Sequence, residues 1–272
     1  MKQQNASIID NPRIRLPTID AGRLKNNKTS IVGFLEVDIT SLREQIRKLH
    51  KQNILFSFTS CIIKIIGDCV AANKAVQAVL LNDRKLFLFD DVDLSISIER
   101  VVDNTHFPYP LIIRAVNKKS IFEIDKEIKI ESEKKIIKGE DLFVVKNKKS
   151  GKFLLQLFYM IPSKARVYIM DLVLRKPGRA KNVVGTVGFA TVNMAGRLAG
   201  WAFPTKNPYS LYIALGSINK KPLVIKNEIK IRDVLNMTTI FDHNIIDGAP
   251  ARNFMNILVN QIENRAIDIY KR

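Results

Sequence analysis

The apolar residues of this chain recur at two spacings, which predict both strands and helices. Residues 31–39 alternate between apolar and polar side chains, a pattern typical of a strand. Residues 41–50 repeat apolar side chains at helical spacing after Thr40, which we expect to cap that helix. The same reasoning predicts strands at 78–81, 85–89, 92–99, 111–115, 185–192, 211–215 and 238–241, and helices at 57–73, 120–137 and 249–270.

Two helix starts carry capping signals. Ser120 is followed three residues later by Glu123, which is the spacing of a capping box. Ser57 or Thr59 is placed to cap the helix expected at 57–73, which is apolar on several faces. A helix that is apolar on several faces is predicted to be buried.

Residues 153–176 mix an apolar run with basic side chains that include Lys164, Arg166 and Arg175. One interpretation is one or two amphipathic helices that cover the core. The other is a helix that docks on a membrane surface or a partner. The pattern alone leaves both open.

Strands and helices occur without strict alternation, which favours an α+β fold over a doubly wound parallel sheet. The chain of 272 residues can bury a large core, and no repeat or Pro/Gly/Ser-rich linker divides it. Residues 1–30 are polar and irregular in pattern. We therefore predict an N-terminal arm over 1–30 and one domain over 31–272.

The chain is strongly basic, with 44 Lys and Arg against 26 Asp and Glu and a formal charge of +18. Such a surplus suits nucleic acid, an anionic membrane surface or a multiply phosphorylated ligand. A compositional bias towards Lys, Asn and Ile accounts for it equally well. We expect no nucleic-acid binding, because no helix-turn-helix, zinc-finger or aromatic-plus-basic strand motif is present.

The two cysteines give no sign of a disulfide or a metal site. Cys61 and Cys69 lie eight residues apart in a predicted helix, a rise of roughly 12 Å, which is too far for a disulfide. Free thiols fit a reducing compartment. The N-terminus lacks the apolar core of a signal peptide, and no apolar run is long enough to cross a bilayer. We expect a cytoplasmic protein with no transmembrane segment and no bound metal.

Of the three histidines, His243 has the most informative surroundings. His50 ends a basic helix and His106 lies in a predicted turn, so both are interpreted as solvated residues. His243 follows a predicted buried strand and precedes Asp247 and Gly248. An imidazole titrates near neutral pH, so at a rigid strand end it can accept and return a proton. A structural histidine is the alternative.

A likeness to a known family extends well beyond this histidine. Residues 242–254 (DHNIIDGAPARNF) resemble the His-x-x-x-Asp-Gly signature of the chloramphenicol acetyltransferase superfamily, above all the catalytic domain of the 2-oxoacid dehydrogenase acyltransferases. Residues 34–42, 91–114, 118–124, 207–208, 214–218 and 221–222 are also similar to segments of that domain. The likeness covers roughly 30–140 and 185–272.

The resemblance implies a mixed sheet with flanking helices, assembled as a homotrimer or a larger array of trimers. It implies that His243 deprotonates a thiol or hydroxyl acceptor, which then attacks the thioester carbonyl of acyl-coenzyme A. Asp247 would hold the histidine loop, and a hydroxyl from the neighbouring subunit would stabilise the oxyanion. Coenzyme A would be a substrate, and the acceptor a small molecule or a carrier-bound group. No coenzyme-binding residues can be named from the sequence.

The hydroxyl donor is the weakest point of the resemblance. The corresponding segment is 185–193 (GTVGFATVN), and two alignments place Ala190 or Val192 in the donor position, where neither side chain can donate. Thr191 lies between them, and a one-residue shift or a bulge would aim it into the site. We predict Thr191 as the donor. A strand threonine that points elsewhere is the alternative.

Two further departures bear on the acceptor. No lipoyl hairpin or small subunit-binding domain precedes the catalytic segment, so we expect no bound lipoyl group in this chain. Residues 141–184 form an insertion, and Trp201 and Pro204 stand where the family has a glycine-rich loop. These aromatic and proline residues either reshape the acceptor pocket or pack over the insertion. The leading hypothesis is an acyltransferase; the alternative is a weak or inactive trimeric scaffold that retains the fold.

Overall fold

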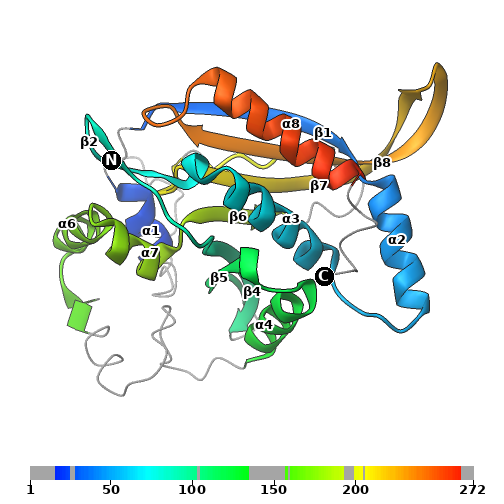
Figure 1. Ribbon diagram of the computed structural model, residues 1–272. Coiled ribbons are helices and arrows are strands. Elements are labelled where there is room, and N and C mark those ends of the chain that lie inside the picture. Colours follow the sequence, from blue (N-terminus) through cyan, green and yellow to red (C-terminus); the bar gives the residue numbers. More distant parts are fainter. Residues whose placement is uncertain are drawn as a thin grey trace, which may run out of the picture.

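A computed structural model describes residues 16–24, 28–102, 105–134, 157–158, 160–192, 199–204 and 206–264 (Figure 1). In this part of the chain, one six-stranded sheet has the order β1-β8-β7-β6-β4-β5. Its strands are β1 (Ser30–Asp38), β4 (Leu94–Val102), β5 (Thr105–Ile113), β6 (Val187–Thr191), β7 (Leu211–Ile225) and β8 (Glu228–Asp242). A separate hairpin pairs β2 (Val79–Asn82) with β3 (Lys85–Phe87).

The main sheet is mixed. The β1–β8, β7–β8 and β4–β5 pairs are antiparallel, whereas β6 runs parallel to both β4 and β7. The parallel pairs require long connections, and the one from β5 to β6 contains α4 (Ile121–Glu133), α6 (Ser163–Leu174) and α7 (Pro177–Val184). The predicted α+β class with flanking helices is confirmed.

The core lies between the sheet and the helices α2 (Thr40–Lys51), α3 (Phe58–Ala72) and α8 (Gly248–Asn264). Figure 1 shows α3 and α8 side by side across the sheet. Phe241 of β8 meets Phe254 of α8 edge to face, with ring centroids 5.9 Å apart. This contact fixes the end of β8 against the start of α8, which is where the candidate site lies.

The capping predictions have different outcomes. Ser57 caps α3, because its hydroxyl accepts from the Ser60 amide at 3.0 Å. Ser120 and Glu123 form the predicted capping box. The prediction for Thr40 was wrong: Thr40 is the first residue of α2, and its hydroxyl accepts the Asp233 amide of β8 instead. A bond to a distant strand has no signal in the local sequence.

The β7–β8 hairpin is much longer than the predicted strands 211–215 and 238–241. It continues to a turn at Lys226 and Asn227, both with positive φ, and projects beyond the body of the molecule (Figure 1). None of the residues in the outer half is buried, and the prediction covered only the buried ends of the two strands. Residues 228–232 of β8 (EIKIR) do alternate between polar and apolar side chains, and the prediction missed this part of the strand.

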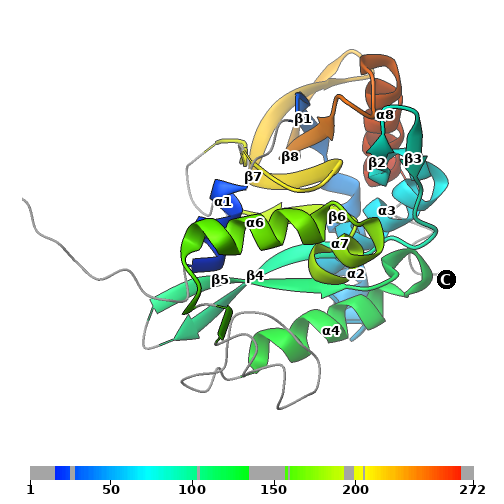
Figure 2. The same ribbon diagram turned by 90° about the vertical axis from the view of Figure 1, so that its left-hand side faces the viewer.

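The irregular arm predicted for residues 1–30 was wrong where the structure describes it. Leu16–Arg23 is a helix, α1, and Asp20 is only 1% exposed because it pairs with Arg166 of α6 at 2.7 Å. Figure 2 shows α1 beside α6. The partner of Asp20 lies 146 residues away in sequence, so periodicity could not reveal the contact.

Helices α6 and α7 are the described part of the predicted insertion; residues 141–156 lie outside the described residues. The apolar side chains of Tyr168, Ile169 and Leu172 on α6 are exposed. Helix α6 packs on α1 and α7, so it does not cover the main core as one interpretation of 153–176 predicted. None of the helices in the described ranges is long and apolar enough to span a membrane.

Candidate functional site

His243 stands immediately beyond the last residue of β8, at the surface of the chain. Its backbone N–H donates to the Thr29 carbonyl at 2.7 Å, and the N–H of Asp242 donates to the Ser210 carbonyl at 2.9 Å. The His243 side chain is 45% exposed. The imidazole is therefore exposed in the single chain, while the end of β8 is held by two other segments; a catalytic role of His243 stays a prediction.

Asp247 lies at the start of α8. Its carbonyl accepts the Ala251 amide at 3.0 Å, which begins the helix. Its carboxylate is 85% exposed, and Oδ1 lies 3.6 Å from Nδ1 of His243. That separation places the carboxylate beside the imidazole. The role of Asp247 in holding the loop stays a prediction.

A buried ion pair that the sequence did not predict lies behind His243. The carboxylate of Asp242 is 5% exposed, and its Oδ2 lies 3.2 Å from Nζ of Lys28. The other oxygen, Oδ1, accepts the Asn244 amide at 3.1 Å. Burial lowers the pKa of the Lys28 ammonium, while the charge of Asp242 opposes this shift. Lys28 belongs to a segment that reads as polar and irregular, so no local signal marks it.

Thr191 is the last residue of β6, and its side chain is exposed. The pairing of β6 with β7 keeps one register from Gly188 to Thr191, so the predicted one-residue shift does not occur there. A register shift does occur in the pairing of β7 with β8, between Leu215 and Ile218. Thr191 is exposed because β6 ends there.

The structure does not bring Thr191 and His243 together within one chain. Thr191 pairs with Leu215 of β7, and Leu215 pairs with Met237 of β8. Met237 precedes His243 by six residues, which is roughly 20 Å along an extended strand. The two side chains therefore lie roughly 20 Å apart along the strand direction, and a site that uses both needs a second copy of the chain.

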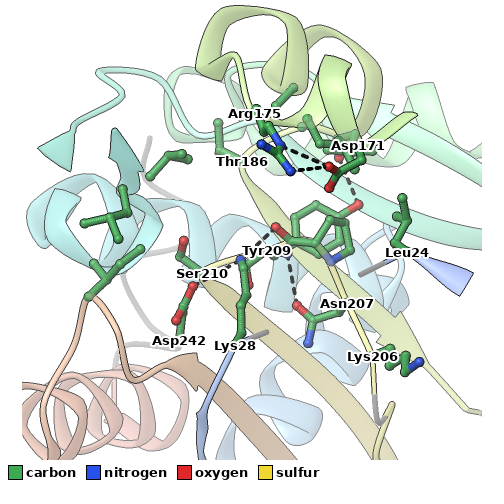
Figure 3. A pocket seen from close by; sticks show the side chains of 18 of the residues that line it. Leu24, Lys28, Asp171, Arg175, Thr186, Lys206, Asn207, Tyr209, Ser210 and Asp242 are labelled. Atoms are coloured by element: carbon green, nitrogen blue, oxygen red, sulfur yellow. Dashed lines mark hydrogen bonds and ion pairs between the residues drawn. The ribbon is translucent and has the colours of Figure 1, made fainter. Parts of the chain in front are cut away.

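A cleft of about 500 Å³ opens beside the end of β8 (Figure 3). Its walls come from the N-terminal segment, the β2–β3 hairpin, α6, α7 and the segment 206–210, and they reach Asp242 and Ile245 on either side of His243. His243 itself is not among the lining residues. Apolar side chains such as Leu80, Leu174 and Val184 make up much of the wall.

Residues 203–267 match the family model of the 2-oxoacid dehydrogenases acyltransferase (catalytic domain). The match includes His243, Asp247 and the strand before them. The fold agrees: a probable dihydrolipoamide acetyltransferase from Listeria monocytogenes 4b F2365 superposes with a TM-score of 0.66 at 18% identity, covering 95% of each chain. Residues 203–267 are thus similar to the 2-oxoacid dehydrogenase acyltransferase catalytic domain, and the described fold is similar to that of such domains.

A second solved structure and a curated protein are also similar to this chain. The truncated catalytic core of a 2-oxoacid dehydrogenase multienzyme complex from Thermoplasma acidophilum has a TM-score of 0.64 at 18% identity, covering 95% of this chain and 99% of that one. A dihydrolipoyllysine-residue acetyltransferase component of the pyruvate dehydrogenase complex from Acholeplasma laidlawii is 32% identical over 98 residues. That match spans 36% of this chain but only 18% of the Acholeplasma protein.

The other two histidines belong to other elements: His50 lies in α2 and His106 in β5. His50 ends α2 as predicted, and its Nε2 lies 2.9 Å from the Phe56 carbonyl. The prediction of a turn at His106 was wrong, because this residue pairs with Val101 within the β4–β5 ladder. His243 is therefore the histidine that the fold places at the family's signature segment.

Trp201 packs on β1. Its Nε1 donates to the Leu35 carbonyl at 3.2 Å, its ring meets Phe34 edge to face, and Nζ of Lys221 lies 5.5 Å from the ring centroid. These contacts are with β1 and β7, and residues 141–156 of the predicted insertion lie outside the described residues. The insertion contributes elsewhere, because α6 and α7 form one wall of the cleft beside β8.

Proposed function

We propose that this chain transfers an acyl group between coenzyme A and a thiol or hydroxyl acceptor, with His243 as the general base. The observation that carries the proposal is the exposed imidazole on a backbone-held strand end, within the segment that matches the acyltransferase family. Relatives of this fold are described as dihydrolipoamide acetyltransferases, which makes acyl transfer the natural reaction class.

The proposed reaction balances without a metal or redox partner. The imidazole of His243 takes the proton from the acceptor thiol or hydroxyl, whose sulfur or oxygen attacks the thioester carbonyl. A tetrahedral oxyanion forms, and it collapses as the bond to the coenzyme A sulfur breaks. The imidazolium then protonates the departing thiolate. The reverse direction uses the same groups.

Thr191 is the proposed oxyanion donor, supplied by a second copy. The solved dihydrolipoamide acetyltransferase of Azotobacter vinelandii, with a TM-score of 0.65 at 14% identity, is described in terms of a serine, a histidine and an asparagine in its catalytic mechanism. That serine and histidine stand as far apart in sequence as Thr191 and His243 do here. The asparagine stands four residues after the histidine, where this chain has Asp247.

A shared site implies a head-to-tail contact, because the two contributing surfaces differ. Such contacts close into rings, and we propose a homotrimer or a larger assembly of trimers. Exposed apolar side chains at two places on the chain support this arrangement. They are Leu80, Leu81, Leu86 and Phe87 on the β2–β3 hairpin, and Val224, Ile229 and Ile231 on the β7–β8 hairpin.

Coenzyme A is the proposed carrier because it is a multiply phosphorylated substrate, and a formal charge of +18 favours polyanions. The acceptor is a small molecule or a carrier-bound group. A cytoplasmic location is proposed from the free thiols of Cys61 and Cys69, which are both buried.

The first test is turnover by the wild-type protein. Purified protein is mixed with acetyl-coenzyme A and a panel of thiols and alcohols that includes dihydrolipoamide, and free coenzyme A is quantified by chromatography. We expect saturable turnover with at least one acceptor and a sedimentation mass of a trimer or a multiple of it. A stable trimer that turns over none of the panel would favour the inactive scaffold instead.

A further inference from the structure

Lys28, which lies behind the histidine loop, takes no part in the proposed reaction. Lys28 Nζ lies 3.2 Å from Oδ2 of Asp242, and donates to the carbonyls of Pro208 at 3.0 Å and Tyr209 at 3.1 Å. An ammonium has three N–H donors. All three thus find acceptors, and these belong to two segments far from Lys28 in sequence (Figure 3).

The same short segment holds His243 from two sides. Through Asp242, Lys28 is linked to the turn beyond the histidine, because Oδ1 of Asp242 accepts the Asn244 amide at 3.1 Å. Through the next residue in the chain, the Thr29 carbonyl accepts the His243 amide at 2.7 Å. His243 therefore has its own N–H and the N–H of its neighbour fixed by contacts that converge on Lys28 and Thr29.

Burial makes these contacts strong. The Asp242 side chain is only 5% exposed, so its carboxylate has little water to replace a missing ammonium. Tyr209, whose carbonyl accepts from Lys28, is itself held in place because its hydroxyl donates to the Val184 carbonyl at 2.9 Å. Loss of Lys28 would remove the links from Asp242 to the Pro208 and Tyr209 carbonyls, and the backbone bond from the Asp242 amide to the Ser210 carbonyl would remain.

We infer that Lys28 is a positioning residue for His243: its ammonium, bound to Asp242 and to two carbonyls, sets the place of the imidazole. The inference rests on the proposed function for its effect on catalysis. Its structural part, the fixing of the His243 backbone by the 28–29 segment, can be measured without any substrate.

The test compares Lys28→Met with the wild type in two measurements. We expect kcat to fall about 10- to 100-fold while KM changes little, since a catalytic group displaced by about 1 Å loses rate of that order. We also expect faster hydrogen exchange at the His243 amide. With only three histidines in the chain, selective ¹⁵N-histidine labelling gives three amide signals to follow.

Further variants separate positioning from folding. Because Lys28→Met leaves a buried carboxylate unpaired, Lys28→Met is also combined with Asp242→Asn, which keeps an oxygen for the Asn244 amide and removes the charge. We expect this pair to fold and still to show the lower kcat and faster exchange. Lys28→Arg should recover part of the lost kcat. Lys206→Met, at an exposed lysine of the same cleft, should change neither measurement.

Unchanged kcat and unchanged His243 exchange in folded Lys28→Met or in the paired variant would overturn the inference. Failure of the proposed function looks different, because the wild type itself would then show no turnover that depends on His243. In that case the exchange rate of the His243 amide decides the role of Lys28 by itself.

Discussion

Replacement of His243 by alanine is expected to lower kcat by about 10²- to 10⁴-fold, the range over which a positioned general base accelerates a reaction. Without the imidazole, the acceptor thiol or hydroxyl must lose its proton to water before it attacks the thioester. The ring is exposed, and the bond that holds His243 to Thr29 is made by its backbone N–H. The substitution should therefore leave the fold intact. The measurement is the initial rate of coenzyme A release at saturating acetyl-coenzyme A and acceptor.

Two controls accompany this variant. His50 lies in the last turn of α2, and its imidazole contacts the Phe56 carbonyl. His50→Ala should therefore leave turnover near the wild-type value. Circular dichroism and thermal unfolding of His243→Ala should match those of the wild type. Equal turnover in His243→Ala and wild type would remove His243 from the reaction.

Thr191→Ala is expected to lower kcat by about 10²- to 10³-fold, because loss of one oxyanion donor commonly has that effect. The side chain is exposed at the end of β6, so the folded chain should tolerate the change. Thr191→Ser keeps the hydroxyl and should retain most of the turnover. Thr191→Val keeps the shape without the hydroxyl and should lose as much turnover as Thr191→Ala. An unaltered kcat in Thr191→Ala would assign the oxyanion to another donor.

Local patterns in the sequence predicted the parts of the fold that depend on local physics. Strand β1 was predicted at 31–39 and is found at Ser30–Asp38, because one of its faces is partly buried and the alternation is clear. The capping box at Ser120 needs only residues three apart. The signature around His243 lies within a few residues of one turn, so a resemblance could find it.

Contacts between distant segments had no such signal. Asp20 pairs with Arg166, and Lys28 pairs with Asp242, in each case across more than half of the chain. Thr40 bonds to β8 where a local cap was predicted. The separation of Thr191 from His243 follows from the register of three strands, which no single segment of sequence specifies.

The separation of Thr191 from His243 allows a direct test of a site that is shared between two chains. His243→Ala and Thr191→Ala chains carrying different tags are co-expressed, mixed assemblies are purified by both tags, and coenzyme A release is measured. If each site takes its imidazole from one chain and its hydroxyl from the next, every mixed trimer holds one intact site of three, so the purified mixed trimers show about a third of the wild-type rate, whereas each variant alone shows about a hundredth of it or less. A mixed assembly no more active than the separate variants would contradict a site shared between chains.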